Sequence, residues 1–222
     1  MLHRPQKRDY PLTDPHILAA TLLAAYLYVV APGPAFLALF TLTAARGRAA
    51  GAWFIIGHLT GDVTWGALAV AAIVGASQIG PTLFEALGFV CGLYLVYLGL
   101  RAVTTRKDAP PRAIGAERPL MTGMAFGLTN PKSYPVALAM FSALVAPYAG
   151  ALHMADAPQL FVAAFAGFLL ADATLIFAAG LSAVRRFFLS HGVAVTRIVG
   201  MIFILFGARS IADAAESAMR RA

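Results

Sequence analysis

Residues 51–75 read GAWFIIGHLTGDVTWGALAVAAIVG, and Asp62 is the single charged side chain in this stretch. A helix that crosses the hydrocarbon core of a bilayer needs about 20 consecutive, predominantly apolar residues. The stretch is long enough for that purpose, and its glycines and alanines suit close packing between helices. The sequence therefore predicts a transmembrane helix with one carboxylate at membrane depth.

The composition of the whole chain supports a membrane protein. Hydrophobic residues make up 60% of the 222 residues and charged residues 12%, against about 45–50% and about 25% in soluble domains. The mean hydropathy is +0.76. The net charge of +7 would indicate nucleic-acid binding in a soluble protein. Here the basic residues lie between apolar runs, so we expect contact with the lipid bilayer and no nucleic-acid partner.

Five further apolar runs have the length of a membrane span, at residues 17–41, 83–103, 120–146, 159–182 and 194–213. The fold class we predict is all-α, a polytopic membrane bundle of about six transmembrane helices. The segments between and beyond them are a polar basic N-terminal extension (1–16), a cytoplasmic loop (104–119) and a polar C-terminal tail (214–222). The first run exceeds the apolar core of a signal peptide, which predicts an uncleaved span. A five-span arrangement is the alternative.

The distribution of Lys and Arg predicts the orientation. The loops after the second and fourth runs hold none of these residues. The loops after the first, third and fifth hold Arg46, Arg48, Arg101, Arg106, Lys107, Arg112, Arg118, Arg185, Arg186 and Arg197. Because cytoplasmic loops are enriched in Lys and Arg, we expect these three loops to be cytoplasmic. Both termini would then lie outside, although each carries basic residues of its own.

The sequence also contains an internal repeat. Residues 57–64 and 167–174 both read Gly-x-x-x-small-Asp-x-Thr, and their aspartates are 110 residues apart (172 − 62). Residues 92–101 and 200–209 both read Gly-x6-Gly-x-Arg, 108 residues apart (209 − 101). We therefore predict two three-helix repeats, 17–103 and 120–213. Because three is an odd number of crossings, the second repeat would be inverted in the membrane, as in many secondary transporters.

Each predicted repeat has a proline-containing break in its first span, Pro32-Gly33-Pro34 in one and Asn130-Pro131-Lys132 in the other. Such a break at membrane depth is tolerated where it lines a cavity or where neighbouring groups bond the freed backbone. A half-helix beginning near Pro34 would present free amides to an anion such as a carboxylate. The alternative is a simple kink. Lys132 would either bind a carboxylate or extend its ammonium group to the interface.

Asp62 and Asp172 are candidates for proton coupling. A carboxylate in a span costs about 2.5–3.5 kcal/mol on insertion scales, so it usually faces the protein interior and has a function. Burial disfavours the charged form, which makes protonation near neutral pH accessible. His58 lies one helical turn before Asp62 and can share its proton. The alternative is that these side chains are structural hydrogen-bonding groups.

Several other classes of function lack their residues in this sequence. The single cysteine, Cys91, excludes a disulfide framework and a CxxC redox pair. We find no Ser/His/Asp triad, P-loop or HExxH motif. We therefore predict a transporter rather than an enzyme, without a cofactor and driven by a gradient or by a separate ATPase.

The chain resembles the LysE/RhtB family of amino-acid exporters over residues of about 17 to 211. The resemblance rests on 31–34 (Ala-Pro-Gly-Pro), 57–62, 92–99 (Gly-Leu-Tyr-Leu-Val-Tyr-Leu-Gly), 129–132 (Thr-Asn-Pro-Lys), Arg197-x-x-Gly200 and Gly207. It implies export of amino acids or related metabolites by proton exchange, by a homodimer in the bacterial cytoplasmic (inner) membrane. The long basic N-terminal extension departs from the family pattern.

The resemblance and the residues combine in one hypothesis. The substrate carboxylate binds near Pro34 and Lys132, its ammonium group approaches Asp62 or Asp172, and protonation of that aspartate releases it outward. One rival is a divalent metal-cation exporter, although hard cations prefer several oxygen ligands and transition metals prefer His or Cys clusters. The other rival is a membrane assembly subunit without transport activity.

Overall fold

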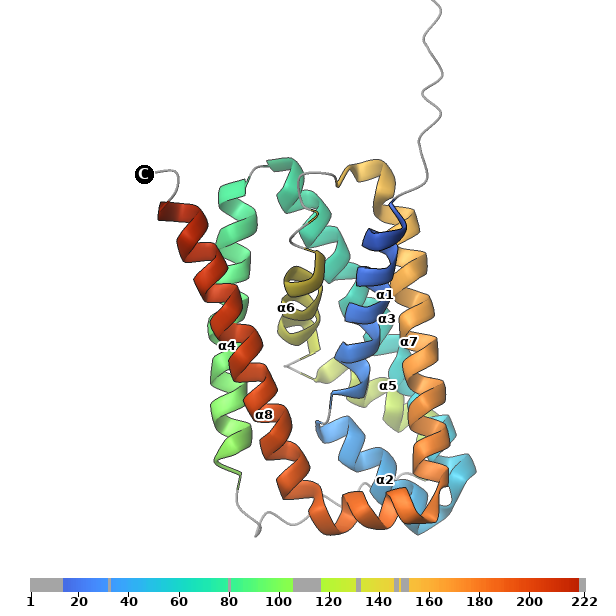
Figure 1. Ribbon diagram of the computed structural model, residues 1–222. Coiled ribbons are helices and arrows are strands. Elements are labelled where there is room, and N and C mark those ends of the chain that lie inside the picture. The colour runs from blue at the N-terminus through green and yellow to red at the C-terminus, as the bar shows by residue number, and fades with distance from the viewer. Residues whose placement is uncertain are drawn as a thin grey trace, which may run out of the picture.

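The computed structural model describes residues 14–31, 33–79, 81–105, 117–130, 133–145, 148 and 152–219. In these ranges the chain is helical, without a strand (Figure 1). The helices are α1 (Pro15–Val30), α2 (Pro34–Arg46), α3 (Arg48–Ile79), α4 (Pro81–Val103), α5 (Pro119–Thr129), α6 (Ser133–Val145), the 3-10 turn η2 (Met154–Asp156), α7 (Ala157–Gly180) and α8 (Ser182–Met219).

Proline and glycine mark the helix boundaries. The helices α1, α2, α4 and α5 each begin at a proline, where the missing amide has no intrahelical partner in any case. Gly47 alone joins α2 to α3, with a positive φ of 87° that other L residues rarely adopt. The axes of α1 and α2 are bent by 57° at the break between them.

Membrane-spanning character is evident in several helices. The described residues include three single helices that are long and apolar enough to cross a bilayer, at Arg48–Gly75, Met154–Gly180 and Ser182–Glu216. The bent pair of α1 and α2 is a fourth if it counts as one span. Shorter apolar helices occupy Phe89–Val103 and Ser133–Val145. The prediction of an all-helical membrane bundle is confirmed at this level, whereas the full count of six spans remains a prediction.

The last helix differs from the sequence prediction. The sixth apolar run covers residues 194–213, but α8 begins at Ser182 and continues to Met219. Its first turns cross one end of the bundle before the helix runs along α4 (Figure 1). Hydropathy identifies only the part of a helix that can lie in lipid. The helix α8 extends beyond that part at its N-terminal end, where Arg185 and Arg186 are good helix formers.

Glycines bring two helix pairs into backbone contact. Gly92 and Gly99 of α4 face Gly207 and Gly200 of α8, and a Cβ added at Gly99 would lie 2.5 Å from the Gly200 carbonyl oxygen. In α3, Gly57 and Gly61 meet the α5 backbone from Leu120 to Gly127. Small residues at these positions allow the close approach that stabilises helix pairs in lipid.

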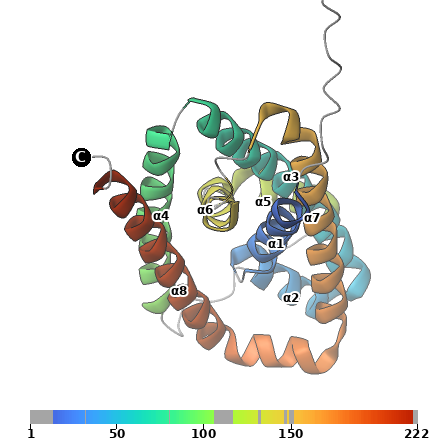
Figure 2. The same cartoon turned by 45° about the horizontal axis from the view of Figure 1, so that its top comes forward.

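The pairing crosses the boundary between the two predicted repeats. The first half-helix of the second repeat, α5, packs on α3, and the first half-helix of the first repeat, α1, packs on α7. Gly167 of α7 lies against the Leu22 carbonyl and Ala25 of α1. The third helices of the two repeats, α4 and α8, pack on each other, while α6 lies in the middle of the bundle (Figure 2).

Candidate functional site

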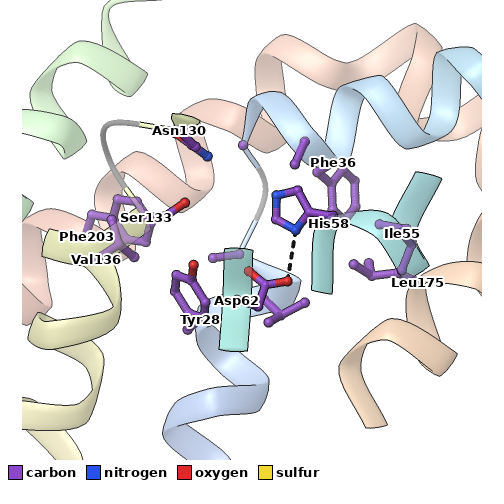
Figure 3. A pocket seen from close by; sticks show the side chains of 14 residues that line it. Tyr28, Phe36, Ile55, His58, Asp62, Asn130, Ser133, Val136, Leu175 and Phe203 are labelled. Atoms are coloured by element: carbon purple, nitrogen blue, oxygen red, sulfur yellow. Dashed lines mark hydrogen bonds and ion pairs between the residues drawn. The ribbon is translucent and has the colours of Figure 1, made fainter. Parts of the chain in front are cut away.

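A cavity of about 60 Å³ lies where the two helix breaks meet α3 (Figure 3). Its polar lining consists of Tyr28, His58, Asp62, Asn130 and Ser133. Its remaining lining is apolar or glycine: Val29, Ala31, Gly33, Ala35, Phe36, Ile55, Val136, Leu175 and Phe203. Residues from α1, α2, α3, α6, α7 and α8 therefore border one space.

Two half-helices begin at this cavity. Gly33 and Ala35 flank the first residue of α2, while Asn130 and Ser133 flank the start of α6, and all four line the cavity. The first amides of a helix have no intrahelical acceptor. They also carry the positive end of the helix dipole. Both helices therefore begin at the cavity, although the first amide of α6, that of Ser133, already donates to the Asn130 carbonyl at 3.1 Å.

His58 and Asp62 form the polar centre of the site. Nδ1 of His58 lies 2.9 Å from Oδ2 of Asp62 in a hydrogen bond within α3 (Figure 3). Both side chains are buried, with exposed fractions of 7% and 1%. The spacing of four residues places them on one helix face. Because the pair is buried and hydrogen-bonded, it can hold a proton at either partner.

Asp172 lies next to this pair. It comes from α7, is 6% exposed, and interacts electrostatically with both Asp62 and His58. It does not line the cavity itself. Among the described residues, Oδ1 of Asp172 and Nε2 of His58 are buried without a hydrogen-bond partner. Buried polar atoms are normally bonded, so Nε2 of His58, which lines the cavity, is available to a ligand, whereas Oδ1 of Asp172, which does not line it, is available to a proton or a water molecule.

Two polar residues of the cavity lining, Tyr28 and Ser133, were not among the sequence candidates. The hydroxyl of Tyr28 interacts with both Asp62 and Ser133. Tyr28 is in the last turn of α1 and Ser133 is the first residue of α6. Their positions beside the two breaks were the available signal, but Tyr and Ser are also common packing residues in membrane helices.

The break between α5 and α6 has a partner on α3. Nε1 of Trp65 donates a hydrogen bond of 3.0 Å to the carbonyl of Gly127, in the last turn of α5. The last carbonyls of a helix lack intrahelical donors, and in lipid such groups need a partner from the protein. Trp65 therefore fixes the end of α5 next to the cavity.

The candidates from the sequence fall into three groups. Gly33, Asn130, His58 and Asp62 line the cavity. Asp172 adjoins it, and Pro34 is the first residue of α2. Pro32, Pro131 and Lys132 lie outside the described residues.

The cavity residues all fall within one family match. A family model described as LysE type translocator matches residues 26–213 of the chain. The chain belongs to the LysE type translocator family. The family resemblance expected from the motifs is thereby confirmed, and membership indicates a membrane transport protein rather than an enzyme. Neither the search of curated proteins nor that of solved structures finds a match.

The described residues do not form a metal centre. Within them, no three His, Cys, Asp or Glu side chains gather closely enough to hold a metal ion.

Proposed function

We propose that the protein is a secondary-active exporter of amino acids or related small metabolites across the bacterial cytoplasmic membrane, by proton antiport. Membership of the LysE type translocator family supports export of a small molecule. The cavity supports the choice of substrate and of coupling ion. The observation that carries the proposal is that both helix breaks and the His58–Asp62 pair border one cavity.

A zwitterion fits the charges around this cavity. The amides at the starts of α2 and α6 would receive the substrate carboxylate, since helix N-termini favour anions. The ammonium group would approach Asp62, whose carboxylate is the buried acceptor in the lining. Half-helix N-termini that point at the anionic group of a substrate recur in secondary transporters.

Proton coupling follows from the burial of the same carboxylate. Substrate ammonium and proton compete for Asp62, so proton entry from outside favours substrate release, and substrate binding from inside favours proton loss. In this proposal His58 shares the proton with Asp62, to which its Nδ1 is hydrogen-bonded. Asp172 interacts with both and adjusts the total charge of the group.

The inverted arrangement of two three-helix repeats, with six crossings, is part of the proposal. It is supported by the helix packing between the repeats. The second span of the first repeat, α3, packs on α5 of the second repeat, and the second span of the second repeat, α7, packs on α1 of the first. A second support is that α4 and α8, the equivalent third helices of the two repeats, pack on each other through glycines at corresponding positions. Such a relation allows two units of similar shape to move about one central cavity and expose it alternately.

Counterflow in proteoliposomes with an imposed pH gradient tests the proposal. We expect amino-acid flux that depends on the gradient in the wild type, and its loss in Asp62→Asn and in Asp172→Asn. Both variants should insert and elute as the wild type does, because asparagine keeps the size of the side chain. Gradient-driven flux retained in both variants would remove the proton role of the aspartates. Divalent-metal flux without amino-acid flux would favour the rival function of a metal exporter. Absence of any flux would favour the other rival, an assembly subunit without transport activity.

A further inference from the structure

We infer that the carried substrate is a monoamino acid with a small aliphatic side chain, of valine or leucine type, and that lysine and arginine are poor substrates. The inference rests on the proposed function, because it concerns the same cavity. Three observations carry it: the charge of the lining, the position of the apolar walls and the size of the space.

The lining offers a partner for one cationic group. Among the described residues that line the cavity, Asp62 is the only carboxylate, and His58 is already bonded to its Oδ2. Asp172 adjoins the pair but does not line the cavity. A second ammonium or guanidinium group would therefore be buried without a counter-charge. Burial of an unpaired charge is strongly unfavourable, so the wall selects against basic side chains.

The walls facing the polar centre are apolar on both sides. Phe36, Ile55 and Leu175 lie on the side of His58, whereas Val136 and Phe203 lie on the side of Ser133 (Figure 3). An aliphatic side chain placed between them removes apolar surface from water. Each buried methylene contributes about four-fold to affinity. The site should therefore favour valine and leucine over alanine and glycine.

The size of the cavity favours a compact substrate. A volume of about 60 Å³ corresponds to roughly four water-sized positions, taking about 15 Å³ for each. Unpaired Nε2 of His58 lies in the same lining and can bond one polar atom of the substrate. A space of this size must widen to admit any amino acid, and it must widen less for a compact aliphatic side chain than for an aromatic one.

Competition in proteoliposomes tests the substrate class directly. With an imposed pH gradient and labelled L-leucine as the probe, unlabelled L-valine should compete at least ten-fold more effectively than L-lysine or L-arginine. Equal or stronger competition by lysine or arginine overturns the inference and leaves the exporter function intact. Absence of flux for every amino acid overturns both, so the two failures are distinguishable.

A charge introduced into the apolar wall gives a second, independent test. Leu175→Glu supplies a counter-charge for a basic side chain, and Leu175→Gln is the control of equal shape. The ratio of lysine to leucine flux should rise about ten-fold in the glutamate variant and stay near the wild-type value in the glutamine variant. An equal ratio in the two variants overturns the role assigned to charge. If the glutamate variant does not insert, the wild-type competition alone decides.

Discussion

At the residue scale, the central feature is a carboxylate that is almost inaccessible in a membrane helix. Asp62 is 1% exposed and bonded to His58 at 2.9 Å. Placing a carboxylate at membrane depth costs about 2.5–3.5 kcal/mol on insertion scales. The bond to His58 and the hydroxyl of Tyr28 offset part of that cost. The three side chains come from α1 and α3, so the site exists only when these helices are assembled.

The Tyr28 hydroxyl provides a test of this assembly. Tyr28→Phe removes one group that interacts with Asp62 and Ser133. Because the hydroxyl lies in the cavity lining beside Asp62 (Figure 3), we expect gradient-driven flux to fall about ten-fold, which corresponds to about 1.4 kcal/mol. The measurement is initial-rate uptake in proteoliposomes at equal protein content. Tyr26→Phe, in the same helix and away from the cavity lining, is the matched control and should retain the wild-type rate.

How far the sequence identifies site residues depends on their chemistry. Asp62, Asp172 and His58 stand out because polar side chains are costly within apolar runs, and the structure places these three together. Tyr28 and Ser133 give no such signal, since neither is costly in a span. Their relation to Asp62 arises from how α1 and α6 pack against α3, which hydropathy does not determine.

At the element scale, glycine positions decide how closely the helices approach. A Cβ added at Gly61 would collide with the backbone of Gly127 in α5. The backbone of α5 cannot yield as a flexible side chain would, because Trp65 also bonds the Gly127 carbonyl. The α3–α5 contact therefore fixes the end of α5 and, through it, the border of the cavity.

Gly61→Ala tests the α3–α5 contact, with Gly75→Ala as the matched control in the same helix. Overpacking a tight contact costs about 1–3 kcal/mol, so we expect Gly61→Ala to lower the melting temperature in detergent by several degrees. A Cβ at Gly75 meets no described atom within 4 Å. Gly75→Ala should leave stability unchanged or raise it slightly, because alanine is the better helix former. Equal melting temperatures in the two variants would contradict the assigned contact.

Elements were predictable from the sequence where a local signal exists. The proline-containing breaks predict the end of α1 and the start of α2, and the structure has α1 ending at Val30 and α2 beginning at Pro34. The extent of α8 was not predictable, because the polar residues after Leu181 suggest a loop while the backbone stays helical. The packing of helices from one repeat on helices of the other was not predictable either. Gly57 and Gly123 each indicate a close helix contact, but neither glycine identifies the helix that it contacts.

At the scale of the whole molecule, basic helix ends gather at one end of the bundle. The junctions α2–α3 and α7–α8 and the end of α4 lie together there (Figure 1). Nη2 of Arg197 donates a hydrogen bond of 3.0 Å to the Thr105 carbonyl, which ties α8 to the end of α4. Nη1 of Arg185 donates to the Ala179 carbonyl at 3.1 Å, in the last turn of α7. Because cytoplasmic segments are enriched in Arg and Lys, we expect this end to face the cytoplasm.

Cysteine labelling tests both this orientation and whether α1 and α2 together cross the bilayer. In a Cys91→Ala background, single cysteines replace His16 at the start of α1, Ala45 at the end of α2, His153 before α7 or Ser182 at the start of α8, all exposed positions. A membrane-impermeant thiol reagent should label the cysteines at 45 and 182 only in inverted vesicles, and those at 16 and 153 only in right-side-out vesicles. The pair at 153 and 182 flanks the continuous span α7 and serves as the internal control.

If the cysteines at 16 and 45 react from the same side, the bent pair of α1 and α2 is a re-entrant loop, and the first repeat has two crossings instead of three. The second repeat would then have a crossing that the first lacks, so this result would contradict the six crossings and the equivalence of the two repeats.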